Sequence, residues 1–257
     1  MSLVARERDA FQSLYPQASI EVASGTSREA IGALFAARCD LAVMTREISA
    51  EERAAAVSGK LNLEGYRFAR DAVVAVVHPA NPVENLTVEE LRRIYAGEAT
   101  RWSQFGGRAE QIVPVAQPPT ADLTECMMRK VMEDQPIAVR SVPARSDSEV
   151  IDEVRSRPGA IGYVSLAWAD RGARALRIAS LKGLAYTKPD PETVYRGEYP
   201  LTRFFNLYAR GSGPRLANGL ITFVTSFDGQ KSVQESGFVP TAVPVRFVRR
   251  SPLRGTH

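Results

Sequence analysis

Histidine and cysteine are scarce in this chain of 257 residues, which contains two of each. The cysteines, Cys39 and Cys126, are too few for a disulfide scaffold and lack the spacing of metal ligands. Because one of the two histidines, His257, is the last residue, a histidine-rich metal site is excluded as well. We therefore expect neither a metal site nor a cofactor.

Long apolar runs are also missing. No segment approaches the ~18 apolar residues of a membrane-spanning helix, and residues 1–10 lack the continuous apolar core of a signal peptide. Hydrophobic residues make up 44% of the chain and charged residues 24%, which is close to the average for soluble globular proteins. We expect a soluble protein that is either cytoplasmic or has had an export signal removed.

Neither sign of charge dominates, since 33 Lys and Arg residues face 29 Asp and Glu residues. The basic residues are scattered except for Arg246, Arg249, Arg250 and Arg254 near the C-terminus. Nucleic-acid binding needs clustered positive charge, so we expect no nucleic-acid partner. An enzyme such as a phosphatase would need a nucleophile with a base or a metal cluster, and the sequence presents neither. We expect no catalytic residues.

Two short polar loops are the most informative segments. Residues 24–27 follow a strand-like run at 18–22, and residues 45–49 follow another at 40–44. Each loop opens a helix, whose first turn carries free N–H groups and the positive end of the helix dipole. If the two strands are parallel neighbours, both loops meet at one edge of the sheet, where such folds bind ligands. The pattern predicts a site for a small oxyanion.

Structural roles for the same residues remain open at this point. Ser27 could be only a helix N-cap, and Arg46 could pair with Glu47 or Glu51. Thr120 could cap the helix that follows it, and Asp122 could be an acidic residue favoured in the first helical turn.

The rest of the chain alternates between strand-like and helix-like segments, which predicts an α/β fold. Capping patterns at Ser49, Thr87 and Ser146, each with Glu three residues later, mark three helix starts. The expected strands are 18–22, 40–44, 72–77, 112–116, 160–164 and 204–209. The other expected helices are 4–14, about 28–38, one ending near 132 and 216–226.

Two proline-containing stretches divide this alternation, at residues 78–82 and 183–200. We interpret them as crossings between two lobes. The prediction is that residues 1–78 and 190–257 form lobe one and that residues 79–189 form lobe two. A single continuous sheet through 72–77 and 112–116 would contradict that division.

The order of the segments resembles the phosphate-binding proteins of bacterial phosphate ABC importers, members of the type II periplasmic-binding-protein class. The resemblance covers nearly the whole chain. It is carried by the segments Asp40–Arg46, His78–Pro82 with Asn85–Thr87, Leu91–Gly97 with Trp102, and Gly159–Tyr163.

This resemblance implies a two-lobe fold with a central cleft, in which phosphate or a similar oxyanion is captured without catalysis. It also implies ABC transporter membrane subunits as partners, a monomer, and a periplasmic or cell-surface location. The first strand of the family, with a loop that touches phosphate, would precede Met1.

The resemblance assigns eight candidate ligand-binding residues. In lobe one they are Thr26, Ser27, Thr45 and Arg46, and in lobe two they are Gln117, Thr120, Ala121 and Asp122. The lobe-two loop departs from the family, which has Arg-x-x-Ser-Gly-Thr where this chain has Gln117 to Asp122. A hydrogen bond to a charged group contributes about 1.5 to 3 kcal/mol. We therefore expect this chain to bind phosphate on the order of ten- to a hundredfold more weakly than the family does, with a dissociation constant in the micromolar range or higher.

A second function stays open because of these departures. The chain could be a degenerate relative that serves as a sensor or interaction module, with weak or no phosphate binding. An effector domain of a transcription regulator shares the fold class, although no helix-turn-helix is present in the sequence.

Overall fold

The computed structural model describes residues 3–137, 140–211 and 213–242. The expected C-terminal basic cluster and His257 lie outside these residues. The α-helices are α1 (Leu3–Leu14), α2 (Ser27–Phe35), α3 (Ala50–Ser58), α4 (Val88–Tyr95), α5 (Asp122–Lys130), α6 (Asp147–Ser156), α7 (Pro191–Arg196), α8 (Arg215–Thr225) and α9 (Phe227–Glu235), with the short 3-10 helices η1 (Trp102–Phe105) and η2 (Leu166–Trp168). The strands are β1 (Leu41–Met44), β2 (Leu63–Val77), β3 (Asn85–Thr87), β4 (Val113–Ala116), β5 (Val142–Pro143), β6 (Ala160–Ser165), β7 (Arg174–Ala175), β8 (Arg177–Ala179), β9 (Thr202–Arg210) and β10 (Val239–Pro240).

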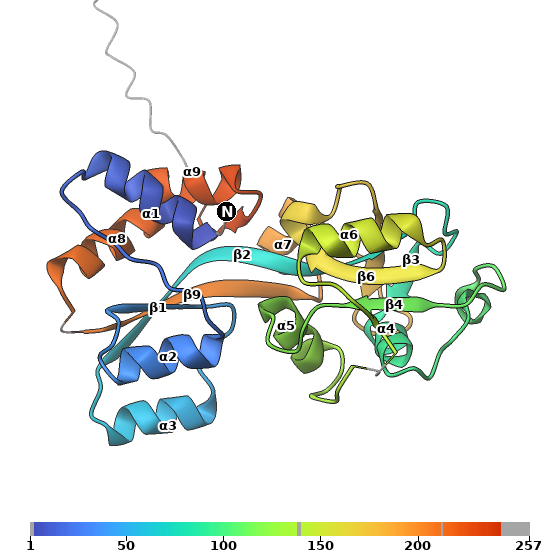
Figure 1. Cartoon of the computed structure of the whole chain (residues 1–257), viewed down its shortest axis with the longest axis horizontal. Coiled ribbons are helices and arrows are strands. Elements are labelled where there is room, and N and C mark those ends of the chain that lie inside the picture. Colours follow the sequence, from blue (N-terminus) through green and yellow to red (C-terminus); the bar gives the residue numbers. More distant parts are fainter. Residues whose placement is uncertain (1–2, 138–139, 212, 243–257) are drawn as a thin grey trace, which may run out of the picture.

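Two long strands connect the two ends of the molecule. The main sheet has the order β1-β9-β2-β6-β4-β5, in which β2 lies between β9 and β6. Residues 63–72 of β2 pair with β9, whereas residues 73–77 pair with β6. Figure 1 shows β2 and β9 running along the long axis, with helices gathered at both ends.

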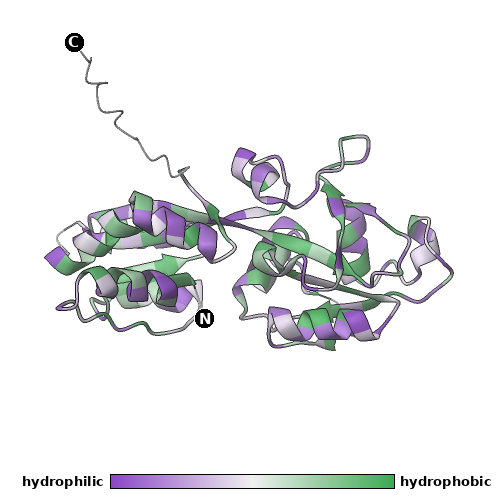
Figure 2. Ribbon diagram, turned by 90° about the horizontal axis from the view of Figure 1, so that it is seen from above, coloured by the Kyte–Doolittle hydropathy of each residue, from purple (hydrophilic) through white to green (hydrophobic). Residues whose placement is uncertain are grey.

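Separate hydrophobic clusters define the two lobes. Around the first half of β2, helices α1, α8 and α9 contribute Phe11, Ile221 and Val233 to one cluster. On the other face of the sheet, α2 packs Ile31 and Leu34 against β1. The larger cluster surrounds the second half of β2 and contains residues 72–77. We call the two ends the first lobe and the second lobe; Figure 2 shows them from above.

The expected boundaries at residues 78 and 190 are therefore wrong, the second because Val194, Tyr199 and Leu201 also lie in the core of the second lobe. Residues 72–77 lie in the core of the second lobe, and they belong to the same sheet as β4. The chain passes between the lobes inside β2 and returns where β9 begins, at Thr202. The prolines at 79 and 82 follow the crossing, because β2 runs as one strand from Phe68 and Ala69 in the first-lobe core to residues 72–77 in the second-lobe core.

Several helix starts are confirmed by their side chains. Ser49 and Glu52 form a complete capping box on α3, and Thr87 and Glu90 form one on α4. Ser146 accepts a hydrogen bond from the N–H of Glu149 at the start of α6. Local sequence fixed these starts because the cap and its partner lie within one helical turn.

The expected strand at 18–22 is wrong, since these residues have no strand conformation. Ala18 and Ile20 instead pack as partly buried side chains against the first-lobe cluster. A strand needs a pairing partner, and within the described ranges β1 pairs with β9 alone, in antiparallel fashion. The expectation of two parallel neighbouring strands behind the two polar loops therefore fails too.

Candidate functional site

Arg46 lies two residues after the end of β1, and a residue in the first turn of α3, in the same lobe, holds its side chain. Its Nη1 donates to Glu52 Oε2 and its Nη2 donates to Glu52 Oε1, each at 2.7 Å. The same Glu52 Oε2 accepts the N–H of Ser49 at 2.8 Å, as part of the capping box. The hydrogen bonds to Glu52 raise the pKa of the Arg46 guanidinium. The helix cap thus fixes the orientation of this cation.

A second carboxylate reaches Arg46 from the other lobe. Arg46 Nε donates to Glu125 Oε1 at 2.7 Å, and Glu125 lies on α5. Only 10% of the Arg46 side chain is exposed, compared with 38% of the Glu125 side chain. The two expected ion-pair partners were Glu47 and Glu51, and neither carboxylate pairs with Arg46 in the described part of the chain. Glu47 contacts Arg46 through its backbone carbonyl oxygen, which accepts a hydrogen bond from Arg46 Nη1 at 2.9 Å.

Thr45 and Asp122 meet at the same junction between the lobes. Burial raises the pKa of the Asp122 carboxyl, and the nearby charge of Glu125 raises it further. The charge of Arg203 and a side-chain hydrogen bond with Thr45 lower this pKa by less, so the net result is a raised pKa. We define the junction cluster as Thr45, Arg46, Asp122, Glu125 and Arg203.

A buried ion pair anchors this cluster to the two crossing strands. Arg203 of β9 donates from Nε and Nη2 to Oδ2 of Asp71 in β2, at 2.9 and 2.7 Å. Asp71 Oδ1 accepts the N–H of Leu166 at 2.9 Å. Arg203 Nη1 is buried and has no hydrogen-bond partner within the described ranges. A guanidinium donor is thus left unused at the junction.

The predicted lobe-two residue Gln117 belongs to a separate polar network. Its side-chain amide donates to Asp147 Oδ1 at 2.6 Å, and Asp147 Oδ2 accepts from the Ser165 hydroxyl at 2.7 Å. The backbone N–H of Gln117 donates to the Tyr163 hydroxyl at 3.2 Å, and Thr124 donates to the Gln117 carbonyl oxygen at 3.2 Å. These contacts hold a neutral amide in place behind α5.

The start of α5 differs from the expectation for Thr120. Ala121 is the N-cap and provides no side-chain hydrogen bond, while Thr120 lies exposed in the preceding turn. Thr120 therefore does not cap the helix. Asp122 is the first residue of α5, as its first-turn interpretation predicts.

The two hydroxyl side chains of the first polar loop differ in their hydrogen bonding. Thr26 is the N-cap of α2 and forms a capping box with Glu29. Ser27, the next residue, is 2% exposed, and its Oγ has no hydrogen-bond partner in the described part of the chain. Thr26 is thus occupied by the helix start, whereas the Ser27 hydroxyl is free to accept or donate.

The structure therefore brings Thr45, Arg46 and Asp122 together and holds Gln117 in a different network. Sequence reasoning missed Glu125, Arg203 and Asp147 altogether, and it read Glu52 only as a capping residue. Glu52 could have been found, because it lies only six residues after Arg46, in the first turn of the helix that follows. Glu125 and Arg203 could not, because each is separated from its partner by a large part of the chain.

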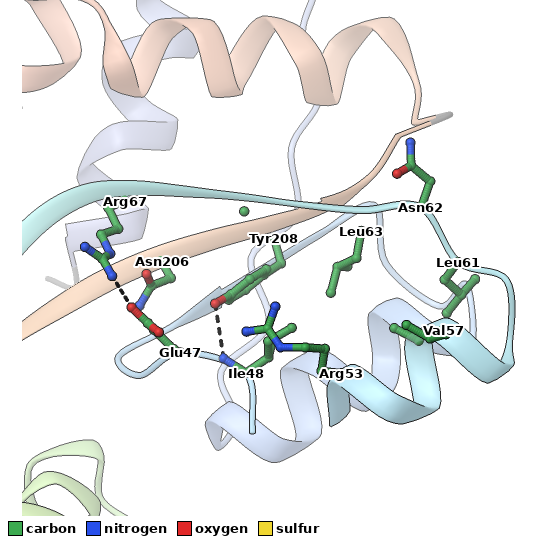
Figure 3. Close-up of a pocket in the computed structure, with 12 residues that line it drawn as sticks. Glu47, Ile48, Arg53, Val57, Leu61, Asn62, Leu63, Arg67, Asn206 and Tyr208 are labelled. Carbon is green, nitrogen blue, oxygen red and sulfur yellow. Dashed lines mark hydrogen bonds and ion pairs between the residues drawn. The ribbon is translucent and has the colours of Figure 1, made fainter. Parts of the chain in front are cut away.

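A pocket of about 550 Å³ lies elsewhere, in the first lobe between α3 and the strands β2 and β9 (Figure 3). Arg53 and Tyr208 line it, and the ion pair of Arg67 with Glu47 borders it. None of the eight candidate residues lines this pocket. The Tyr208 hydroxyl accepts the N–H of Ile48 at 3.1 Å, which ties the loop after Arg46 to β9.

Two kinds of feature are absent from the described residues. These residues contain no group of three or more His, Cys, Asp or Glu residues able to hold a metal ion. They also contain no helix with the length and apolar character required to cross a bilayer.

Comparisons with known proteins extend over nearly all of this chain. A family model described as "PBP superfamily domain" matches residues 1–228. The phosphate-binding protein PstS of Bacillus subtilis is 26% identical over 240 residues, which cover 93% of this chain and 76% of the relative. The PstS of Borreliella burgdorferi is 26% identical over 218 residues, covering 81% of this chain and 75% of the relative.

Solved structures share the fold at low sequence identity. A putative phosphate ABC transporter substrate-binding protein from Clostridium perfringens, with bound phosphate, has a TM-score of 0.78 and 23% identity, covering 93% of this chain and 94% of that one. An ABC-type phosphate transport receptor from Vibrio cholerae has a TM-score of 0.80 and 24% identity, covering 92% and 96%. The α/β fold is that of type II periplasmic phosphate-binding proteins.

Proposed function

Because the chain belongs to the PBP superfamily domain family, we propose that it captures a small oxyanion, with phosphate as the ligand, for an ABC importer. The binding place is the junction between the lobes. The observation that carries this proposal is Arg46, a cation that stands at the end of β1 and contacts both lobes. The partners of this chain would be the membrane subunits of the transporter, and the chain would be located in the periplasm or at the cell surface.

The junction cluster offers the donors that an oxyanion needs. Arg46 supplies a charged fork, and a guanidinium binds the oxygens of phosphate by charge-assisted hydrogen bonds. Thr45 lies beside Arg46 and adds a hydroxyl. Helix α5 begins at the junction without a side-chain cap, so its first N–H groups are free to donate.

An acidic group at the junction favours a protonated oxyanion over a fully ionised one. This group is Asp122, which forms a side-chain hydrogen bond with Thr45, whereas Glu125 is already paired with Arg46. A carboxylate can accept the proton of hydrogen phosphate, whereas it repels sulfate, which has no proton to donate at neutral pH. We propose that this difference selects phosphate over sulfate.

Isothermal titration calorimetry at neutral pH and low salt tests the proposal. Phosphate is expected to bind in the micromolar range or more weakly, and sulfate at least about tenfold more weakly than phosphate. The absence of both a heat signal and a thermal shift with phosphate at about 10 mM would contradict it. Equal affinity for the two anions would contradict the role given to the Asp122 carboxylate.

A second function is favoured by one specific observation. Both carboxylates that contact Arg46 compete with an external anion, and Gln117 brings no charge from the second lobe. A degenerate relative that acts as a sensor or interaction module fits this pattern. In the same titration, the absence of phosphate binding would favour the second function, which is expected to show weak or no binding.

A further inference from the structure

We infer that the Glu125 carboxylate is an internal competitor of the ligand: it occupies the edge of Arg46 that an oxyanion would otherwise take, and it holds the lobes together while it does so. This inference rests on the proposed function, since it concerns how that same site is regulated. It gives Glu125 a role in setting affinity that neither the fold nor the family resemblance assigns.

The first observation is how Arg46 distributes its hydrogen bonds. It donates once from Nε, twice from Nη1 and once from Nη2, which uses four of its five N–H groups. Glu52 takes two of them with both of its oxygens, while Glu125 takes only Nε, with one oxygen. An oxyanion on the Nε side can accept from Nε and Nη2 together, which makes it a better partner for that edge than Glu125.

The second observation is that the two carboxylates differ in how firmly they are held. Glu52 also accepts the Ser49 N–H, and its side chain is 16% exposed. The Glu125 carboxylate accepts no other hydrogen bond among the described residues, and the Glu125 side chain is 38% exposed. Because a half-exposed carboxylate returns to water at little cost, Glu125 is the one that an incoming anion displaces.

The third observation is the direction of the contact. Glu52 and Arg46 belong to the same lobe, whereas Glu125 reaches Arg46 from α5 of the second lobe. The Arg46–Glu125 pair therefore joins the lobes without any ligand. When an oxyanion replaces Glu125, the anion rather than the Glu125 carboxylate connects the two lobes. The measured affinity for the oxyanion is therefore reduced in two ways, by the loss of the Arg46–Glu125 pair and by repulsion between the oxyanion and Glu125.

The test compares three variants in a titration with inorganic phosphate. Glu125→Gln removes the charge, and Glu125→Ala also removes the hydrogen bond. The control is Glu153→Gln, because Glu153 is on α6 of the same lobe and pairs with Arg157 at 2.8 Å, away from the junction. We expect phosphate to bind about fivefold more tightly to Glu125→Gln, about tenfold more tightly to Glu125→Ala, and unchanged to the control.

Measurable phosphate binding that is unchanged or weakened in both Glu125 variants would overturn the inference. A second measurement needs no ligand: small-angle X-ray scattering of the phosphate-free chain should give a larger radius of gyration for Glu125→Ala than for the unmodified chain or the control. If no variant binds phosphate, the proposed function fails, and the scattering still decides the role of Glu125. An identical radius of gyration in all three proteins would overturn that role.

Discussion

The two sides of the lobe junction contribute different charges. The first lobe presents a cation, Arg46, whose donors are largely occupied by Glu52 and Glu125. The second lobe presents the carboxylates of Asp122 and Glu125 on α5, while its neutral amide Gln117 is held by Asp147 in a separate network. The first side thus supplies a cation that is already paired, and the second side supplies negative charge. We propose that an anion enters this junction by exchange with a carboxylate.

This difference shows why a binding fold can keep its architecture while its affinity changes. The strands β2 and β9 place both sides, and their geometry depends on core packing and on the Asp71–Arg203 pair. The ligand contacts that we propose depend on single side chains beyond the ends of those strands. Substitutions at Gln117 or Glu125 can therefore alter binding without altering the fold.

Asp71→Ala is expected to have the largest effect, because it breaks the tie that holds the two sides in register. It leaves the buried Arg203 guanidinium without its partner, in a position where only 6% of the side chain is exposed. Removing one partner of a buried pair costs about 3 to 5 kcal/mol. Urea unfolding followed by circular dichroism measures this loss of stability. Glu153→Gln is the control, since an exposed pair contributes at most about 1 kcal/mol; equal losses for the two variants would contradict the prediction.

Glu7 is a buried carboxylate that, unlike Asp71, forms no ion pair with any residue that the structure describes. Burial raises the pKa of Glu7 in α1 to about 7, against a smaller lowering by the Ser232 hydroxyl. Because the folded chain then holds a proton more tightly than the unfolded chain, stability falls as the pH rises from about 4.5 to about 7. Glu7→Gln should remove this fall and stabilise the protein by on the order of 3 kcal/mol above neutral pH, with little effect near pH 4.5. Thermal unfolding across this pH range measures it, and a pH-independent difference would refute it.

Supplying a positive charge on the second side should raise phosphate affinity. The substitution Gln117→Arg adds a guanidinium and leaves Asp122, the proposed acceptor of the phosphate proton, in place. The expected gain is on the order of tenfold, corresponding to about 1.4 kcal/mol. Gln135→Arg adds the same charge at an exposed site in the second lobe and is the matched control. Calorimetry that gives equal gains for the two proteins would show that the gain reflects net charge alone.

Removing the cation from the first side should have the opposite effect. Arg46→Ala deletes the charged fork and leaves Glu52 and Glu125 without their common partner. Phosphate binding is expected to weaken at least about tenfold. Unchanged affinity in calorimetry would remove Arg46 from the site. Arg157→Ala, which deletes an exposed arginine paired with Glu153, controls for the change in net charge.

Sequence was sufficient where the determining partners are close along the chain. The capping boxes at Ser49 and Thr87 and the apolar run at 73–77 gave the correct helix starts and a buried strand. The strand expected at 18–22 failed because alternating polarity cannot supply a pairing partner. The place of Arg46 was predictable from its strand end, but its occupation by Glu125 was not, because 79 residues separate them.

A crystal structure grown with phosphate tests the central claim most directly. We predict a tetrahedral anion within hydrogen-bond distance of Arg46 Nε and Nη2, with Glu52 still paired to Arg46 and with Glu125 turned away. An intact Arg46–Glu125 pair at saturating phosphate, with the anion bound elsewhere or absent, would contradict the claim that phosphate binds at the lobe junction by exchange.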